Sequence, residues 1–195
     1  MLTDNEKKVL KLLFTAFEED YSINNIAKRC GISPNGAVKI LNKFEKQGIL
    51  KPKKIANIKS YKINFENEKT IIILELTLIP KLEKKLKYRL DDLKELKEIT
   101  NACIVFGSYI NMNKKPNDLD ILFVLDKNNF EKYKKRLSHL REIIPLKIHD
   151  VLQTEEDLKQ NIIQKDKIIL NILKTGIILW GQRTIVGIIK DVYKR

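Results

Sequence analysis

The chain has 195 residues, a hydrophobic content of 43% and a formal net charge of +13 at pH 7. This length allows one medium domain or two small ones with packed cores, which excludes a chain that is disordered throughout. No apolar run approaches the roughly 20 residues of a membrane span, and the N-terminal sequence MLTDNEKK is too polar for a secretory signal. We therefore expect a soluble, cytoplasmic protein with no membrane partner. Cys30 and Cys103 lie far apart in apolar patterns, which indicates buried reduced thiols and not a zinc site.

Most of the positive charge lies in one segment of the chain. Residues 22–65 contain ten Lys or Arg residues and one acid, a net charge of +9 in less than a quarter of the chain. Such a segment is typical of proteins that bind polyanions, although a lysine-rich surface can also be merely solvated. Charge alone leaves both interpretations open.

Boundary signals divide the first 65 residues into three helices and two strands. N-cap residues, a proline at a first helical position and turn glycines occur at Thr3, Ser22, Gly31, Ser33, Pro34 and Gly48. The first three segments carry apolar residues at helical spacing, and ILKPKKIANIKSYKINF predicts two short strands around a basic loop. This order of elements is that of a winged helix-turn-helix.

The stretch SINNIAKRCGISPNGAVKILNKFEKQGIL resembles the winged-helix family over its full length. The resemblance implies that the helix after Ser33 enters the major groove of double-stranded DNA, while the strands meet phosphates. The predicted DNA-binding residues are Ser33, Asn35, Lys39, Lys43, Lys53, Lys54 and Lys59. Winged helices also act as protein-docking or dimerisation modules, and this is the alternative.

Residues 66–100 are expected to connect an N-terminal domain, residues 1–65, to a C-terminal domain, residues 101–195. The run IIILELTLI fits either a helix or a buried strand. After Pro80, leucines and isoleucines from Leu82 to Ile99 recur at steps of three or four, which predicts one amphipathic helix of about five turns. We expect its apolar face to pack on the following domain, with homodimerisation as the alternative.

Two predicted strands, ACIVFG and LDILFVL, carry polar residues at their ends. Alternation along a strand places Asp118 and Asp120 on one face, where two like charges call for a cation between them. Mg²⁺, or Mn²⁺ in its place, fits a pair of carboxylates. Gly107 and Ser108 follow the first strand and suit the close approach of a nucleoside triphosphate. The combination predicts phosphoryl or nucleotidyl transfer.

The stretch VFGSYINMNKKPNDLDILFVL resembles the nucleotidyltransferase superfamily that includes DNA polymerase beta, and especially its minimal members. The resemblance covers roughly residues 99–181 and implies an α/β fold with a small mixed sheet flanked by helices. It assigns Gly107 and Ser108 to the nucleotide, expected to be ATP, and Asp118 and Asp120 to the metal.

The resemblance also implies a third acid on a later strand. In PLKIHDVLQ, Asp150 is the candidate, as a metal ligand or a base, and the competing acids are Asp126, Glu131 and Glu142. His149 is expected to face the other way and to be structural or exposed.

The residues after Ser108 depart from the family pattern. Relatives carry an Arg- or Gly-rich continuation there, whereas this chain has Tyr-Ile-Asn-Met-Asn, so the resemblance assigns no further triphosphate contact. Lys114 and Lys115 could neutralise phosphate or be only solvated.

Together these features predict a two-domain α+β protein, a winged helix joined to a minimal nucleotidyltransferase. Minimal members often act as antitoxin-like adenylyltransferases that modify a toxin of the HEPN type, so the resemblance implies such a protein partner. One alternative is a DNA-binding regulator whose transferase-like domain senses a nucleotide or docks a partner without turnover. Another is an enzyme that modifies nucleic-acid ends.

Overall fold

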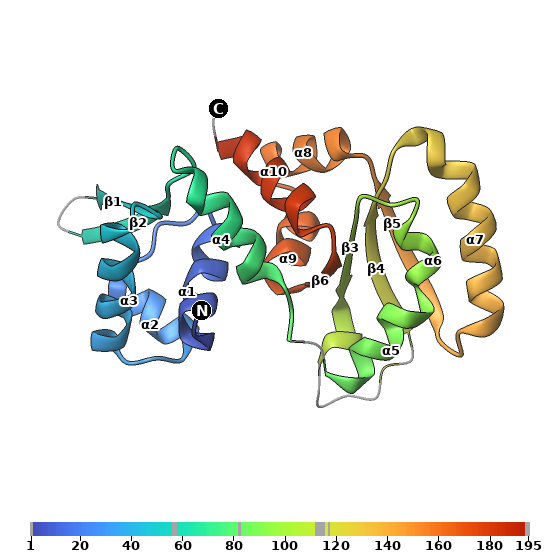
Figure 1. The fold of residues 1–195 in the computed structure, drawn as a ribbon, viewed down its shortest axis with the longest axis horizontal. Helices are drawn as coiled ribbons and strands as arrows, with labels where there is room; N and C mark the ends of the chain where they lie inside the picture. The colour runs from blue at the N-terminus through green and yellow to red at the C-terminus, as the bar shows by residue number, and fades with distance from the viewer. Residues whose placement is uncertain (1, 56–57, 82, 112–115, 117, 194–195) are drawn as a thin grey trace. The chain divides into compact units, whose positions relative to one another are not determined.

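The chain folds into two compact units, residues 1–78 and 79–195 (Figure 1). The computed structural model describes residues 2–55, 58–81, 83–111, 116 and 118–193. The segment expected as a connector, residues 66–100, is divided between the two units. Within the described ranges, no helix is both long and apolar enough to cross a membrane.

The first unit consists of helices and a two-stranded antiparallel ribbon. Its elements are α1 (Asp4–Thr15), α2 (Ile23–Cys30), α3 (Pro34–Lys46), β1 (Leu50–Ile55), β2 (Ile58–Ile63) and α4 (Glu68–Leu78). Thr3, Ser22 and Ser33 cap α1, α2 and α3 as predicted, and Thr3 forms a reciprocal capping box with Glu6. Gly31 ends α2 in the left-handed region, with φ of 66°. The predicted order of helices and strands is confirmed up to β2.

The run IIILELTLI, for which helix and strand were both open, forms most of α4. This helix packs against α1 through one face, on which Leu74 is fully buried. Ile72 and Leu76 on another face of α4 are exposed. Apolar residues therefore occur on all sides of α4 and do not form a single stripe. For this reason hydrophobic periodicity could not distinguish a helix from a strand here.

The second unit is built around a four-stranded mixed sheet. Its strands are β3 (Ala102–Phe106), β4 (Asp118–Val124), β5 (Lys147–Gln153) and β6 (Ile177–Trp180). Its helices are α5 (Lys84–Asp92), α6 (Lys94–Lys97), α7 (Phe130–Ile143), α8 (Glu155–Ile163), α9 (Lys167–Thr175) and α10 (Gln182–Tyr193), with single 3₁₀ turns η1 (Gly107–Ile110) and η2 (Lys127–Asn129). The spatial order is β5-β4-β3-β6, in which β4 and β5 run parallel and the other pairs antiparallel. This confirms the predicted small mixed sheet flanked by helices.

The prediction of one five-turn helix after Pro80 is wrong, because the chain forms two shorter helices, α5 and α6, that meet at Leu93. Leu93 has φ of −89° and ψ of 1°, outside the α-helical range. Leu93 and Leu96 are both fully buried, so the change of direction brings both side chains into the core. Leu82, the first residue of the predicted apolar stripe, lies outside the described residues.

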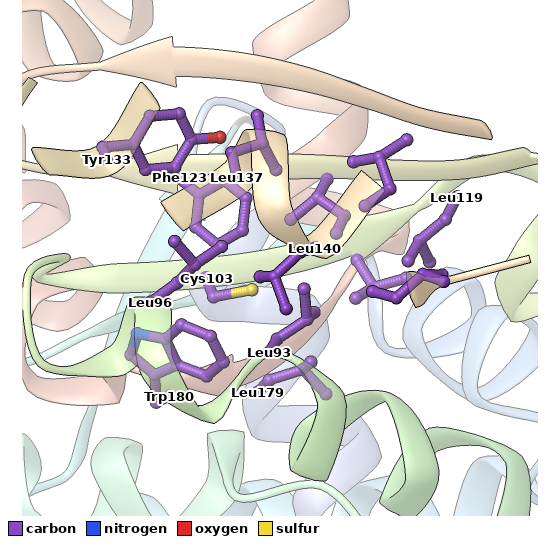
Figure 2. Packing of buried hydrophobic residues seen from close by; sticks show 14 of the residues in the cluster. Leu93, Leu96, Cys103, Leu119, Phe123, Tyr133, Leu137, Leu140, Leu179 and Trp180 are labelled. Atoms are coloured by element: carbon purple, nitrogen blue, oxygen red, sulfur yellow. The ribbon is translucent and has the colours of Figure 1, made fainter. Parts of the chain in front are cut away.

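The two faces of the sheet pack against different helices (Figure 1). Leu119, Ile121 and Phe123 of β4 belong to the cluster that includes Tyr133 and other residues of α7. Figure 2 shows this cluster, in which Trp180 packs near Phe123 with ring centroids 6.2 Å apart. Trp180 also donates a hydrogen bond from Nε1 to Thr100 Oγ1 at 3.1 Å, so it is a buried packing residue of this core.

The opposite face of the sheet carries α8, α9 and α10, which contact β5 and β3. Cys103 is fully buried in the first face and Cys30 is buried in the other unit, and neither forms a disulfide. Burial raises the pKa of the Cys103 thiol well above its usual range. Both cysteines are therefore protonated core residues, as predicted.

Candidate active site

Asp118 and Asp120 lie at the start of β4, on the face of the sheet opposite α7. Their side chains are 37% and 23% exposed, whereas the intervening Leu119 is fully buried. Two-residue periodicity accounts for this arrangement, since successive side chains of a strand point to opposite faces. The strand thus holds both carboxylates at a rigid and solvent-accessible position.

Gly107 allows the Asp120 carboxylate to lie directly against the backbone. Its φ is 69°, and a Cβ atom at this position would be 2.1 Å from Asp120 Oδ2. Any other residue would therefore meet both backbone strain and a steric overlap. Phe106, the last residue of β3, is paired with Asp120 in the β3–β4 ladder, which places the turn beside the carboxylate.

Ser108 orients the other carboxylate. Its Oγ donates a hydrogen bond to Asp118 Oδ1 at 3.0 Å, and the residue lies in the single turn η1. The assignment of Ser108 to the nucleotide stays a prediction, and in this structure its hydroxyl donates its hydrogen bond to Asp118. Lys85 supports the same turn, because its Nζ donates to the carbonyl oxygen of Tyr109 at 2.9 Å.

His149 is the third member of the site. Asp118, Asp120 and His149 each offer a ligand atom, and the three atoms lie within 4.8 Å of one another. His149 Nδ1 is 3.3 Å from Asp120 Oδ1 and 3.8 Å from Asp118 Oδ2. The parallel ladder pairs Asp120 with His149, so both side chains leave the same face of the sheet.

The structure does not bring Asp150 to the aspartate pair, and the predicted placement is wrong. Asp150 points to the α7 face, where its carboxylate accepts hydrogen bonds from Tyr133 Oη at 3.0 Å and from Arg141 at 2.7 Å. Burial, reinforced by the Asp150 charge, raises the pKa of Tyr133 far above its usual range. Asp150 therefore connects β5 to α7 through these two hydrogen bonds.

None of the three competing acids joins the site. Asp126 lies beyond the far end of β4 and accepts a hydrogen bond from Asn101, while Glu131 and Glu142 belong to α7. Lys114 and Lys115, considered for phosphate, lie outside the described residues.

A groove with a volume of about 620 Å³ lies beside Asp120 and His149. The residues that line it are Phe106, Asp120, Arg141, Leu146, Lys147, Ile148, His149, Asp150 and Val151. Its size is within the range of small-molecule sites. Lys147 is paired with Asp118 in the β4–β5 ladder, so it supplies a positive charge on the same face as the two carboxylates.

The predicted DNA-binding residues occupy α3 and the ribbon of the first unit. Ser33 Oγ accepts a hydrogen bond from the Gly36 N–H at 3.1 Å, so it serves as the N-cap of α3. Asn35, Lys39 and Lys54 are exposed. The remaining three form ion pairs within the unit, Lys43 with Glu6, Lys53 with Asp20 and Lys59 with Glu45.

Comparisons with known proteins address the second unit most directly. The family model described as "Polymerase beta, Nucleotidyltransferase" matches residues 84–182, which is just over half of the chain. The match includes Gly107, Ser108, Asp118, Asp120 and His149. No curated protein matches the chain.

Solved structures of ZitR variants from Lactococcus lactis are similar over part of the chain. Two of them are 18% and 21% identical, cover 73% of this chain and 75% of their own, and have TM-scores of 0.33 and 0.34. A third, in complex with DNA, is 21% identical, covers 50% of this chain and 75% of its own, and has a TM-score of 0.30. TM-scores this low do not establish a shared fold. The family model, in contrast, spans the sheet and the aspartate pair, and the chain belongs to the polymerase beta nucleotidyltransferase family.

Proposed function

We propose that the second unit transfers a nucleoside monophosphate from a nucleoside triphosphate, with ATP as the expected donor, to a hydroxyl group of an acceptor. The observation that carries this proposal is the pair Asp118 and Asp120 beside the Gly107–Ser108 turn, within the region that matches the family. In the reaction, the acceptor oxygen forms a bond to the α-phosphorus. The bond from that phosphorus to the bridging oxygen breaks, pyrophosphate leaves with the electron pair, and the acceptor proton passes to water.

The donor atoms of Asp118, Asp120 and His149 fit a divalent cation, because two carboxylates and one imidazole converge within 4.8 Å. When bound, such a cation stabilises the negative charge that develops on the phosphate and acceptor oxygens. Ser108 holds the Asp118 carboxylate in one orientation, and Gly107 leaves the space that Asp120 occupies. These contacts keep the carboxylates in place before any ligand binds.

The acceptor we propose is a protein, specifically a partner toxin of the HEPN type. Support for this acceptor comes from the resemblance to minimal nucleotidyltransferases. The alternatives are a regulator that binds nucleotide without turnover and an enzyme that modifies nucleic-acid ends. Binding of ATP without release of pyrophosphate would favour the regulator, and labelling of an added oligonucleotide would favour the third function.

The decisive experiment incubates the full chain with ATP labelled at the α-phosphate, a divalent cation and the product of a neighbouring gene. We expect the label to be transferred to that protein and to fall about 100-fold or more in an Asp118→Asn/Asp120→Asn variant. The variant Asp91→Asn/Glu131→Gln, which neutralises two exposed acids away from the site, is the matched control and should retain wild-type labelling. Equal labelling by wild type and the Asp118→Asn/Asp120→Asn variant would contradict the proposal.

We also propose that the first unit is a winged helix that binds duplex DNA. The supporting observation is the outward face of α3, where Asn35, Lys39 and Lys43 are exposed, next to the basic ribbon. Lys39 and Lys54 form no ion pair with another described residue. Lys53 and Lys59 would have to exchange their carboxylates for phosphates, and exposed ion pairs are weak enough, about 0–1 kcal/mol, to allow this. Lys43 is held more firmly, because the side chain of its partner Glu6 is only 8% exposed.

Salt dependence tests the DNA-binding proposal. Binding to duplex DNA should weaken steeply with salt, and a Lys39→Gln/Lys54→Gln variant should reduce the slope of log affinity against log salt by about 2, since each lost phosphate contact contributes about 0.9. Lys132→Gln/Lys135→Gln on the exposed side of α7 makes the same charge change and should leave the slope nearly unaltered. Absence of binding even at about 20 mM salt, or an equal loss in both variants, would refute the assignment.

A further inference from the structure

We propose that His149 is a ligand of the active-site cation and makes the site selective for a first-row transition-metal dication, such as Mn²⁺, over Mg²⁺. This inference rests on the proposed function, because it concerns the same aspartate pair. It specifies the chemical class of the cation, which the two carboxylates alone leave open.

The donor atoms available at the site include both oxygen and nitrogen. Asp118 and Asp120 provide carboxylate oxygens, whereas the strand beside them provides the imidazole of His149. The ring nitrogen Nδ1 lies 3.3 Å from Asp120 Oδ1, and the side chain is 46% exposed. Its position is thus close enough to share one cation with the carboxylates and open enough for the cation to enter.

No third carboxylate from β5 can replace the imidazole. All residues of this strand are described, and Asp150 is its only acid. That carboxylate lies on the opposite face, 15% exposed, and accepts hydrogen bonds from Tyr133 and Arg141. To reach the pair, Asp150 would have to give up both partners and pass to the other side of the sheet, which would leave Arg141 and the buried Tyr133 hydroxyl without their acceptor.

The parallel ladder fixes the imidazole in this place. Its register runs from Asp118 paired with Lys147 to Val124 paired with Gln153. A slip of one residue would turn Ile148, which is only 3% exposed, out of the core and turn His149 into it. His149 is therefore held beside Asp120 by the same burial that stabilises the sheet.

The chemistry of the donors then decides which cation is preferred. Mg²⁺ favours oxygen ligands throughout and usually retains several waters, whereas imidazole suits later first-row metals such as Fe²⁺, Ni²⁺ and Zn²⁺. Mn²⁺ accepts carboxylates and is the most weakly bound dication of the first-row transition series. A preference for Mn²⁺ over Mg²⁺ is therefore the strictest test of a nitrogen ligand within that series. Mn²⁺ is also paramagnetic, which makes it a direct probe of the residues around it.

The test measures binding of Mn²⁺ and, separately, of Mg²⁺ to the full metal-free chain by calorimetry. We expect the wild type to bind Mn²⁺ at least about tenfold more tightly than Mg²⁺, and His149→Asp to reduce this ratio to about threefold or less by adding an oxygen ligand. His139→Asp is the matched control, because His139 is the only other histidine and is exposed on α7. An unchanged ratio in a folded His149→Asp chain, or in a folded His149→Asn chain should the aspartate variant not fold, would overturn the inference.

Nuclear magnetic resonance of the wild-type chain gives a second readout that needs no variant. Since the chain has two histidines, its imidazole signals are few, and a small amount of Mn²⁺ should broaden those of His149 and spare those of His139. Broadening of neither or of both equally would overturn the inference. If Mn²⁺ binds through His149 but the chain transfers no label, only the proposed function is refuted. If label transfer depends on Asp118 but Mn²⁺ makes no contact with His149, only this inference is refuted.

Discussion

Gly107 and Asp120 show how one residue determines the shape of the site. The glycine adopts φ of 69°, and the space that a side chain would fill is taken by the Asp120 carboxylate. The glycine is therefore required for the position of an acid thirteen residues later in the chain. A contact of this kind links the predicted nucleotide residues to the predicted metal residues.

Gly107→Ala should weaken cation binding by about tenfold or more and lower the free energy of unfolding of the second unit by about 1–2 kcal/mol. The physical reason is that the new Cβ would be 2.1 Å from Asp120 Oδ2, so the carboxylate must move. Calorimetric titration with Mn²⁺ and chemical unfolding followed by Trp180 fluorescence measure the two effects. Gly31→Ala is the matched control, since Gly31 has φ of 66° but nothing within 4 Å of an added Cβ, and it should leave cation affinity unchanged. Wild-type cation affinity in Gly107→Ala would contradict this role of the glycine.

Within the first unit, one ion pair connects two helices. Glu6 of α1 is 8% exposed at its side chain and accepts hydrogen bonds from Lys43 Nζ of α3 at 2.6 Å and from the Thr3 N–H at 2.8 Å. Burial by itself would raise the pKa of Glu6, but the hydrogen bonds from Lys43 and Thr3 outweigh it and hold the pKa below the usual 4.5. The carboxylate is thus part of the structure that positions α3.

This pKa shift predicts an acid-dependent loss of stability. Because the pKa of Glu6 is lower in the folded than in the unfolded state, its contribution is present above about pH 4.5 and is lost as pH falls through the folded pKa. Glu6→Gln should therefore lower the free energy of unfolding of the first unit by about 1–2 kcal/mol near neutral pH, with a smaller difference at about pH 3.

Urea unfolding followed by circular dichroism at the two pH values measures this difference. Trp180 fluorescence reports the second unit separately, because Trp180 is the only tryptophan in the chain. Asp4→Asn on the same turn of α1 removes an exposed charge and serves as the control. A Glu6→Gln effect that is the same at both pH values would be inconsistent with the ion pair.

Over the whole molecule, the positive charge is shared between the units. Residues 1–78 contain 14 basic and 9 acidic residues, a net charge of +5, and residues 79–195 contain 24 and 16, a net charge of +8. The basic segment of residues 22–65 is partly neutralised, because five of its ten basic residues form ion pairs with acids of the same unit. A net charge of this sign favours association with polyanions, and we expect Lys39 and Lys54, which form no ion pair with another described residue, to contribute to it at the surface of α3 and the ribbon.

Local rules were sufficient to predict most elements of this fold. Caps at Thr3, Ser22 and Ser33, and the compact apolar runs of β3 and β4, depend on residues close together in sequence. The break at Leu93 was not predictable, because the direction of α6 follows from burial of Leu93 and Leu96 against residues elsewhere in the chain. Patterns of period 3.6 show that a face is apolar but not where the helix must bend.

The candidate site also has one part that follows from local sequence and another that depends on long-range packing. Alternation along a strand is a consequence of covalent geometry, so the sequence by itself determined that Asp118 and Asp120 share a face and that His149 and Asp150 do not. Which of the latter two stands beside the aspartates depends on the register between β4 and β5, two strands separated by α7. That register is set by burial of Ile148 on the α7 face, a long-range packing effect, and only the tertiary structure placed an imidazole where the motif had suggested a third carboxylate.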